Sequence, residues 1–426
     1  MLDVDAAYRN SPLFQQLEAI ATSGWTLPDS RARRHHYNPR LIVRRFVGRA
    51  KDGSQQLYRL DVKRGTPKRT SVDNAGSELR YYRFSDDEGR PHNRVESFFS
   101  IVEAHAAEAL TRLLAVPHAL SGPDRATLSF FFALLDGRTP GGTARTAAFS
   151  DTSMRLLLAT ECADPQAFAA RYRDTISEGS DEEIEATRRR MVAGLRTGDV
   201  AFPDPKANAL KLGLQSAGSS CKDIFLMRWS LLRARDGEFV TSDRALAMHD
   251  PSPEYPWSAQ AWRSSPDVET TIPLSSNACL LVTPGPPFTD ERGIARETVE
   301  RINLRTYGWA QRYLYGSSQQ TVVEMHTAAK KRPRDVVRPI TPKQVLLFEA
   351  DPSDDALSRE HGRRRWPGRL AVEGVEHDYV VLDSPGDPIE TVEQAARVAQ
   401  VVKDRSGAYA SPDRPRIEPV DSCAID

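Results

Sequence analysis

Apolar residues recur at helical spacing between residues 94 and 114, and this segment is the clearest helix that the sequence predicts. The side of this helix that faces the core would carry Val95, Phe99, Val102, Ala106 and Leu113. A second helix is predicted from about Asp124 to Asp136 by its apolar residues, and Gly137 marks its end. Ser180 and Glu183 have the Ser-x-x-Glu spacing of a capping box, which predicts the start of a third helix.

Shorter apolar runs that are bounded by turn-forming residues predict strands. Residues 41–47 and 57–62 are expected to pair as a hairpin around a Lys-Asp-Gly-Ser turn at residues 51–54. Further strands are predicted over residues 225–234, 238–241, 271–272, 278–282, 345–348 and 379–382. Amphipathic helices are predicted within residues 1–30 and over residues 299–315.

These elements predict an α+β fold, in which helices and antiparallel hairpins form one large domain with a C-terminal extension. Residues 1–30 would be an N-terminal helix and lead-in, and residues 31–325 the core domain. Prolines and charged residues multiply beyond Lys330, so residues 326–426 are predicted to form an extension that is partly disordered at its end.

Composition narrows the possible environment of the chain. The 58 basic residues balance the 58 acidic ones, so only local clusters of charge can indicate a partner. No run approaches the roughly 18 apolar residues of a membrane helix, and the first ten residues do not resemble a signal peptide. The four cysteines are widely scattered, which argues against a zinc site or a disulfide framework. We therefore expect a cytoplasmic protein with no membrane partner.

One segment has a strong local charge. From Arg31 to Lys51 there are seven arginines and one lysine, without a single Asp or Glu. Such a cationic segment attracts phosphate. The alternative is that the base composition of the genome favours arginine codons, which would produce the same excess of arginine. We expect DNA or RNA as the partner of the Arg31–Arg49 segment, and the residues that would contact it are Arg33, Arg34, Arg44 and Arg45.

Four polar residues are candidates for chemistry. His36 is able to ligate a metal or to move a proton near neutral pH, and Arg138 follows an apolar helix on a loop from which it could clamp a phosphate or cap the helix. Asp243 closes an apolar strand in the sequence Thr-Ser-Asp, a placement seen in metal and catalytic sites, although the spacing alone favours an ordinary turn. Glu103 lies on the predicted helix from residue 94.

Glu96 and Glu103 share one flank of that helix, while His105 points to the opposite flank. Seven residues separate the two glutamates by roughly 10 Å along the helix axis, so at most one of them can belong to a given metal centre. The alternative is that both are ordinary surface residues at the edge of a helix.

Several well-known signatures are missing from the sequence. It contains no Gly-x-Ser-x-Gly elbow, Walker A loop, Gly-x-Gly-x-x-Gly, His-Glu-x-x-His or kinase motif. These absences disfavour a serine hydrolase, a nucleotide motor and the known types of metalloprotease, and they leave no motif for a nucleotide cofactor.

A set of short motifs nevertheless occurs in a familiar order. The motifs are His36-Tyr37-x-Pro39 with Arg45-Phe46, then Glu103, Arg138-Thr139-Pro140, Phe239-Val240-Thr241-Ser242-Asp243, Pro273-Leu274-Ser275 and Asn303…Tyr307. In this order the chain resembles the bacterial domain of unknown function 4238 family over about residues 31–325. It departs from the family at Leu41-Ile42, where an aromatic residue is usual, and at Ala245, where a proline is usual.

The resemblance implies an architecture and a set of residues, but no reaction. Residues of the types that can do chemistry stand at the motif positions of the family, and such sets usually converge on one site. His36, Glu103, Arg138 and Asp243, hereafter the polar set, are therefore expected to lie in one pocket.

Two functions from different classes follow from the polar set. The first is a metal-dependent nuclease, in the setting of a toxin or an antiphage effector. Glu103 and Asp243 would then hold Mg²⁺ or Mn²⁺, His36 would be a general base or a further ligand, and Arg138 would stabilise phosphate charge. No recognised nuclease motif accompanies these residues.

The second function is a non-catalytic nucleic-acid-binding or regulatory protein. The polar set would then be a buried structural network, in which His36 pairs with Asp243 and Arg138 pairs with Glu103. The two functions predict different surroundings for these side chains. In an enzyme they would converge around an open cleft, whereas in a structural network they would be buried and paired with one another.

Overall fold

The computed structural model describes the chain in several stretches, and contacts group the described residues into two compact units. The core unit comprises residues between 3 and 146 and between 206 and 331, and the smaller unit comprises residues between 147 and 205 and between 367 and 380. This grouping sets residues 147–205 apart from the rest of the predicted 31–325 core. The described residues are 3–24, 27–49, 55–86, 88–144, 146–147, 158, 161–162, 165–173, 180–197, 205–249, 268–331, 367–372 and 375–380.

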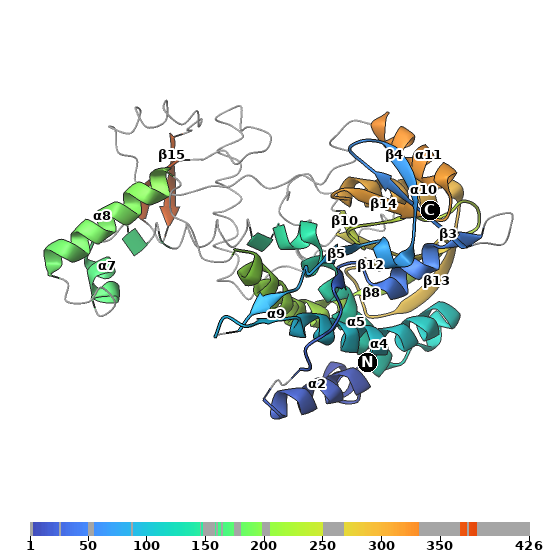
Figure 1. The fold of residues 1–426 in the computed structure, drawn as a ribbon, viewed down its shortest axis with the longest axis horizontal. Coiled ribbons are helices and arrows are strands. Elements are labelled where there is room, and N and C mark those ends of the chain that lie inside the picture. The colour runs from blue at the N-terminus through green and yellow to red at the C-terminus, as the bar shows by residue number, and fades with distance from the viewer. Residues whose placement is uncertain are drawn as a thin grey trace. The chain divides into compact units, whose positions relative to one another are not determined.

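The predicted helices at residues 94–114 and 124–136 are confirmed, and they pack against each other as α4 (Arg94–Ala115) and α5 (Gly122–Gly137). α5 begins at Ser121, whose side chain accepts the backbone N–H of Asp124. Near the N-terminus, the predicted amphipathic helix is two short helices, α1 (Val4–Arg9) and α2 (Pro12–Thr22). α9 (Pro205–Leu226) completes the helices that surround α5 in Figure 1.

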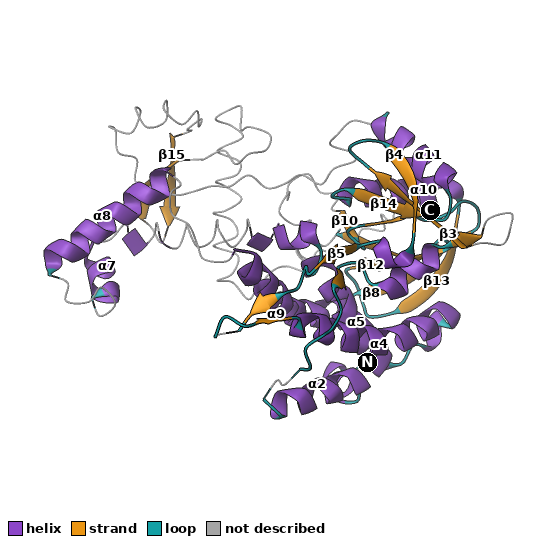
Figure 2. Cartoon of the chain, viewed as in Figure 1, coloured by secondary structure: helices purple, strands orange, loops and turns teal. Residues whose placement is uncertain are grey.

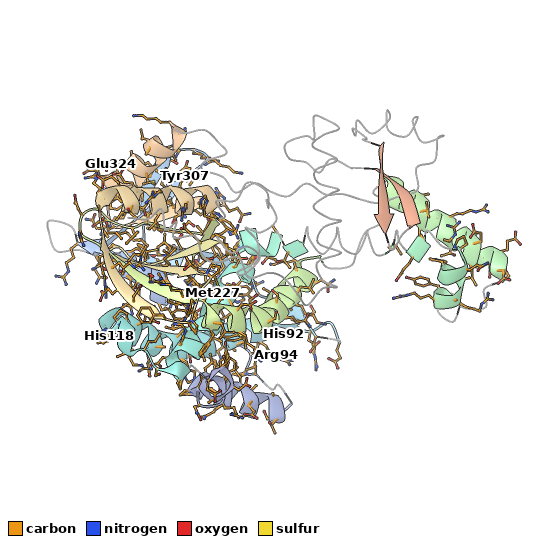
Figure 3. The ribbon with its side chains drawn as sticks, turned by 180° about the vertical axis from the view of Figure 1, so that it is seen from behind. His92, Arg94, His118, Met227, Tyr307 and Glu324 are labelled. Carbon is orange, nitrogen blue, oxygen red and sulfur yellow. The ribbon has the colours of Figure 1, made fainter. Side chains whose placement is uncertain are left out.

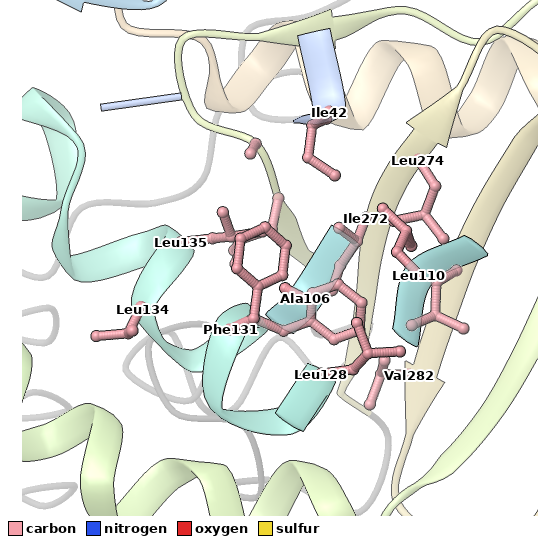
Figure 4. Close-up of a cluster of buried hydrophobic side chains, with 14 of the residues drawn as sticks. Ile42, Ala106, Leu110, Leu128, Phe131, Leu134, Leu135, Ile272, Leu274 and Val282 are labelled. Carbon is pink, nitrogen blue, oxygen red and sulfur yellow. The ribbon is translucent and has the colours of Figure 1, made fainter. Parts of the chain in front are cut away.

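The first sheet of the core unit has the order β10-β11-β12-β8-β13. All neighbours are antiparallel except β13, which runs parallel to β8. It shares a hydrophobic core with α4 and α5, and Figure 4 shows Ile272 and Val282 of the sheet beside Leu110 and Phe131 of these helices. The strands are β8 (Arg228–Ala234), β10 (Ala247–His249), β11 (Glu269–Ser275), β12 (Ala278–Thr283) and β13 (Thr289–Ile294).

The strand predicted over residues 41–47 is wrong. These residues form α3 (Arg40–Val43) and the short 3-10 helix η1 (Arg44–Phe46). Ile42, Val43 and Phe46 are all fully buried, and a helical bend directs the three side chains into one core, whereas a strand would turn Ile42 and Val43 to opposite faces. A shorter hairpin does form between β2 (Gly48–Arg49) and β3 (Gln55–Asp61). The predicted turn at residues 51–54 lies outside the described residues.

Two other elements have different bounds in the structure from those predicted. The predicted strand from residue 225 begins only at Arg228, because α9 continues to Leu226. The helix predicted over residues 299–315 is α10 (Arg296–Trp309), which is followed by the strand β14 (Tyr313–Gly316). β14 pairs with both β3 and β9 (Thr241–Ser242), so its conformation depends on strands that are distant in sequence.

The second sheet has the order β2-β3-β14-β9. A further strand, β4 (Thr66–Thr70), pairs with the edge of β3 that faces away from β14. α10 and α11 (Gln319–Lys330) cover one face, where Leu60 and Leu314 pack against Val322 and Met325. Figure 2 shows these two helices beside β14, and Figure 3 labels Tyr307 on α10 and Glu324 on α11. Side chains alternate along a strand, so Arg59 and Tyr315 project from the opposite face.

Short elements complete the core unit. β1 (Arg34–His36) pairs with β5 (Ser77–Leu79), and the 3-10 helix η2 (Val72–Asn74) leads from β4 into β5. β6 (Phe84–Ser85) pairs with β7 (Pro91–His92), and η3 (Pro117–Ala119) joins α4 to α5.

The smaller unit contains α7 (Pro165–Tyr172), α8 (Asp181–Thr197) and the hairpin of β15 (Pro367–Val372) and β16 (Val375–Val380). The predicted capping box at the start of α8 is confirmed, because Ser180 Oγ accepts the N–H of Glu183 and the Glu183 carboxylate accepts that of Ser180. The strand predicted at 345–348 and the disorder predicted at the C-terminus fall outside the described residues. No helix in the described part of the chain has both the length and the apolar character needed to cross a bilayer.

Candidate functional site

Arg138 lies at the centre of a buried polar cluster at the C-terminal end of α5. Its side chain is only 2 % exposed, and Nη2 donates to Oε1 of Glu103 at 2.8 Å. The same nitrogen donates to the main-chain carbonyl oxygen of His36 at 2.6 Å. The ring of Phe99 lies against the guanidinium, with 4.0 Å between Cζ and the ring centroid. The expected ion pair between Arg138 and Glu103 is therefore confirmed.

Glu96 also belongs to this cluster. Burial raises the pKa of Glu96 to about 7, Arg138 opposes the rise, and the Glu103 carboxylate adds to it. The backbone N–H of His36 also donates to Glu96 and so favours its charged form. The sequence predicts that the two glutamates share one flank of the helix, and it makes only Glu103 a candidate for the site. The structure brings both glutamates close to Arg138.

The imidazole of His36 is buried and points toward Arg40 and Asp73. Nε2 lies 3.1 Å from the carbonyl oxygen of Asp73 and 3.3 Å from Nε of Arg40. Burial lowers the pKa of His36 to about 4, and the charge of Arg40 lowers it further. His36 is consequently neutral at neutral pH. The predicted pair between His36 and Asp243 is wrong, because the Asp243 carboxylate has other partners.

Asp243 binds the connection between α10 and β14. Its carboxylate oxygens accept the backbone N–H groups of Gln311, Arg312 and Tyr313 at 2.7–2.9 Å. The residue is 4 % exposed, and this burial raises its pKa even though the three N–H groups favour the charged form. Ser242 Oγ accepts the N–H of Arg244 at 3.1 Å, so the Thr-Ser-Asp motif forms a turn that presents Asp243 to residues 311–313.

These partners do not fit a divalent ion shared by Glu103 and Asp243. Oε1 of Glu103 is in the ion pair with Arg138, and both oxygens of Asp243 accept backbone N–H groups. Within the described stretches, no three His, Cys, Asp or Glu side chains gather closely enough to hold a metal ion. An Mg²⁺ or Mn²⁺ ion would have to displace the present partners of both carboxylates.

An open cleft lies on the second face of the second sheet, next to the polar set. Its volume is about 850 Å³, and its lining contains five cationic side chains and one acidic side chain, Glu78. The cations, from four different segments of the chain, are Arg34, Arg59, Lys68, Arg69 and Arg312. Three tyrosines, Tyr37, Tyr313 and Tyr315, also line this space, which we call the basic cleft.

Two of the five cleft cations donate to neutral oxygen atoms. Arg34 donates to Ser77 Oγ at 3.3 Å and Arg69 to the carbonyl oxygen of Gln55 at 3.1 Å. Arg312 alone of the five has a carboxylate partner within ion-pair distance among the described residues, and that partner is Asp61 at 3.3 Å. The basic cleft therefore has an excess of positive charge that the described part of the chain does not neutralise.

Tyr313 contacts two guanidinium groups in this cleft. Cζ of Arg59 is 4.4 Å from the centroid of its ring, and Cζ of Arg312 is 4.8 Å away. The ring and the two guanidinium groups thus form a cation–π cluster in the basic cleft.

The polar set is connected to the floor of the basic cleft through residues 37, 38 and 315. Nδ2 of Asn38 donates to the carbonyl oxygen of Ser242 at 2.6 Å, directly before Asp243. Tyr315 accepts the N–H of Gly76 on its hydroxyl oxygen at 2.9 Å, and its hydroxyl is also hydrogen-bonded to that of Tyr37. Burial raises the pKa of both tyrosines, so both hydroxyls stay protonated. His36, Glu103 and Arg138 are in one cluster, and Asp243 is in an adjacent one.

The arginines predicted to contact substrate are divided by the structure. Arg34 lines the basic cleft, whereas Arg33 and Arg44 are exposed and are not part of its lining. Arg45 is half-buried and lies 3.4 Å from the hydroxyl of Thr111 on α4. Its place beside a core helix indicates packing more than ligand contact.

Sequence reasoning missed Arg59, Lys68, Arg69 and Arg312. Alternating polar positions on β3 and β4 were the only local signal for Arg59 and Lys68. For Arg312 no local signal existed, because its place depends on the pairing of β14 with β3.

A scan against protein families matched one family model, described as "Protein of unknown function (DUF4238)", over residues 34–320. No curated protein and no solved structure matched the chain. The family match covers more than half of the 426 residues, and it includes the polar set and the whole lining of the basic cleft. The chain therefore belongs to the DUF4238 family of proteins of unknown function.

Proposed function

We propose that this protein binds nucleic acid in the basic cleft and does not cleave it. The observation that supports this proposal is the gathering of five cations around one cleft, four of them without a carboxylate partner in the described part of the chain. Unneutralised arginines and lysines bind phosphates and release the counterions of the nucleic acid, which is the main source of affinity in such complexes.

The polar set has a structural role in this proposal. Arg138 is 2 % exposed and is already bonded to Glu103 and to the His36 carbonyl, so it has no surface on which to receive a substrate phosphate. The Asp243 carboxylate is likewise occupied by backbone N–H groups. Side chains that are buried and paired in this way favour the structural-network function over the nuclease, which would need Glu103 and Asp243 to exchange their partners for a metal ion.

The proposal is tested by exchanging the cleft cations for neutral residues of similar length. We expect the double variant Arg59→Gln/Lys68→Gln to bind a labelled 20-mer of DNA or RNA more weakly. Its plot of log affinity against log salt should be flatter by about 1.5 units, because each lost phosphate contact removes about 0.7–0.9. Fluorescence anisotropy at several salt concentrations gives both quantities.

The matched control is Arg33→Gln/Arg44→Gln, which also removes two arginine charges but leaves the cleft lining intact. We expect this control to bind with almost the wild-type affinity and salt dependence. If the control loses binding while the cleft variant keeps it, the arginines predicted from the sequence form the interface and the basic cleft does not. If the wild type binds no nucleic acid at all, the proposed function is wrong.

A further inference from the structure

We infer that the ligand of the basic cleft is a single strand of nucleic acid and not a duplex, an inference that rests on the proposed function. It follows from the shape of the cleft, from the order of side chains along its floor and from the uncharged polar groups between the cations.

The shape of the cleft suits a strand. The cleft is concave, and its volume of about 850 Å³ is within the range of roughly 300–1,000 Å³ that is typical of pockets for small ligands. A duplex is itself convex, and proteins read it by inserting a protruding helix or ribbon into one of its grooves. A flexible strand can enter such a concavity and bring its phosphates to the half-buried Arg59 as well as to the exposed Lys68 and Arg69. A rigid duplex could meet the exposed cations but would approach Arg59 less closely.

A row of paired residues crosses the floor from a lysine to a tyrosine. Lys68 on β4 pairs with Arg59 on β3, and Arg59 pairs with Tyr315 on β14. Neighbouring strands lie about 4.8 Å apart, so this row crosses three strands from the edge of the sheet inward. A strand that lay with its phosphates near Lys68 and Arg59 would turn its bases toward Tyr313 of β14, because Tyr315 is only 1 % exposed.

The side of the floor near β14 can stack on a base. Tyr313 is half-buried, and Arg59 and Arg312 lie within 5 Å of its ring centroid. Aromatic rings and guanidinium planes are the surfaces on which proteins stack unpaired bases, and stacking tolerates any base because every base has a π-face. Paired bases inside a duplex do not offer that face.

Uncharged polar side chains lie between the cations. Gln55, Ser71, Asn74 and Ser77 line the cleft together with Thr70. Such groups can donate to or accept from base edges or the 2′-hydroxyl of RNA. We therefore expect a weak preference among sequences and sugars, in addition to a strong preference for single strands.

The test compares a labelled 12-mer single strand, as DNA and as RNA, with the duplex of the same sequence and with AMP as a competitor. Full-length protein is used, and binding is followed by fluorescence anisotropy at one salt concentration. We expect at least one single strand to bind about tenfold or more tightly than the duplex. AMP should compete only at much higher concentration, because it makes one phosphate contact.

The stacking surface is tested by Tyr313→Phe and Tyr313→Leu. The phenylalanine variant keeps the ring and should bind the strand like the wild type, while the leucine variant should lose about tenfold in affinity. Melting temperature is measured for both variants, and if the leucine variant is unfolded, Arg59→Lys takes its place, since it keeps the charge but removes the guanidinium plane.

Each outcome separates this inference from the proposed function. Equal or tighter binding of the duplex overturns the single-strand inference and leaves nucleic-acid binding standing. Competition by AMP as effective as that of the 12-mer overturns it as well, and points to a nucleotide site. Absence of binding to strand and duplex alike overturns both.

Discussion

At the residue scale, Glu96 and Glu103 lie on the same helix but differ in their hydrogen-bond partners. Glu103 accepts directly from Arg138 and is 21 % exposed. Glu96 has one carboxylate oxygen that is buried without a hydrogen-bond partner among the described atoms, and its pKa is raised to about 7. Glu96 therefore takes up a proton in the folded protein at a pH at which it has lost that proton in the unfolded chain.

The first prediction concerns the pH dependence of stability at Glu96. Its folded pKa of about 7 is above the ordinary value of 4.5, so the folded state binds more protons between these values. The stabilising contribution of Glu96 is complete below about pH 4.5 and is lost as the pH rises through 7. Glu96→Gln stays neutral, so its melting temperature relative to wild type should rise between pH 5 and pH 8.5.

The exposed Glu108 on the same helix provides the control. Glu108→Gln should change the melting temperature by a similar amount at pH 5 and at pH 8.5. Taking the difference between variant and wild type also cancels the contribution of His36, whose lowered pKa acts between about pH 4 and 6.5. Parallel melting curves for Glu96→Gln and wild type across this range would show that Glu96 is not protonated by its surroundings.

The second prediction concerns the ion pair of Arg138. Arg138→Met keeps an unbranched apolar chain in place of the arginine stem but leaves Glu103 without its partner and the His36 carbonyl without its donor. Breaking a buried pair in this way costs about 3–5 kcal/mol, which chemical denaturation can measure. Arg138→Met/Glu103→Leu removes both charges and should recover part of that loss. A loss below about 1 kcal/mol in the single variant would contradict the structural role of the network.

At the element scale, Asp243 joins the end of α10 to β14. The carboxylate holds three successive backbone N–H groups, and two of those residues, Arg312 and Tyr313, line the basic cleft. The turn around Asp243 thus determines where the cleft side chains of β14 lie, although Asp243 itself does not line the cleft.

The third prediction follows from this connection. Asp243→Ala removes the acceptor of three N–H groups, and each one that stays buried without a partner costs about 1–3 kcal/mol. The variant should therefore be clearly destabilised and should bind the single strand more weakly. Thermal denaturation and anisotropy measure the two effects, and Asp236→Ala, at a turn outside the basic cleft, is the control.

The same variant also tests the nuclease interpretation when wild type and Asp243→Ala are screened together on DNA and RNA with Mg²⁺ and Mn²⁺. We expect no cleavage that depends on Asp243. A variant that keeps its melting temperature and loses divalent-dependent cleavage would instead make Asp243 catalytic.

At the scale of the whole molecule, the core unit is built from two separate stretches of chain. β3 lies in the first stretch and β14 in the second, and these strands are paired in the second sheet. α4 and α5 of the first stretch also share a hydrophobic core with β8 and β12 of the second. The two stretches should therefore depend on each other for folding.

The fourth prediction applies limited proteolysis to this arrangement. Cleavage beyond residue 331 should come first and leave nucleic-acid binding intact. A later cut between residues 147 and 205 should leave two fragments that elute together in size-exclusion chromatography, because paired strands and a common core hold them. A fragment ending near residue 200 that is stable alone would show that residues 31–325 do not unfold as one unit.

The sequence by itself determined the features that depend on neighbouring residues. Helical spacing identified α4 and α5, a capping box located the start of α8, and the ordered motifs indicated the family. These signals are local, because one turn of a helix or one cap is specified by residues three or four positions apart.

Only the tertiary structure decided the rest. Burial on one side made residues 41–46 helical, and pairing with β3 and β9 made residues 313–316 a strand. The basic cleft brings together Arg34, Arg59 and Arg312, and the first and last of these lie near the two ends of the family match at residues 34–320. No local pattern specifies such a meeting, because it arises from strand pairings whose free energy depends on residues hundreds of positions away.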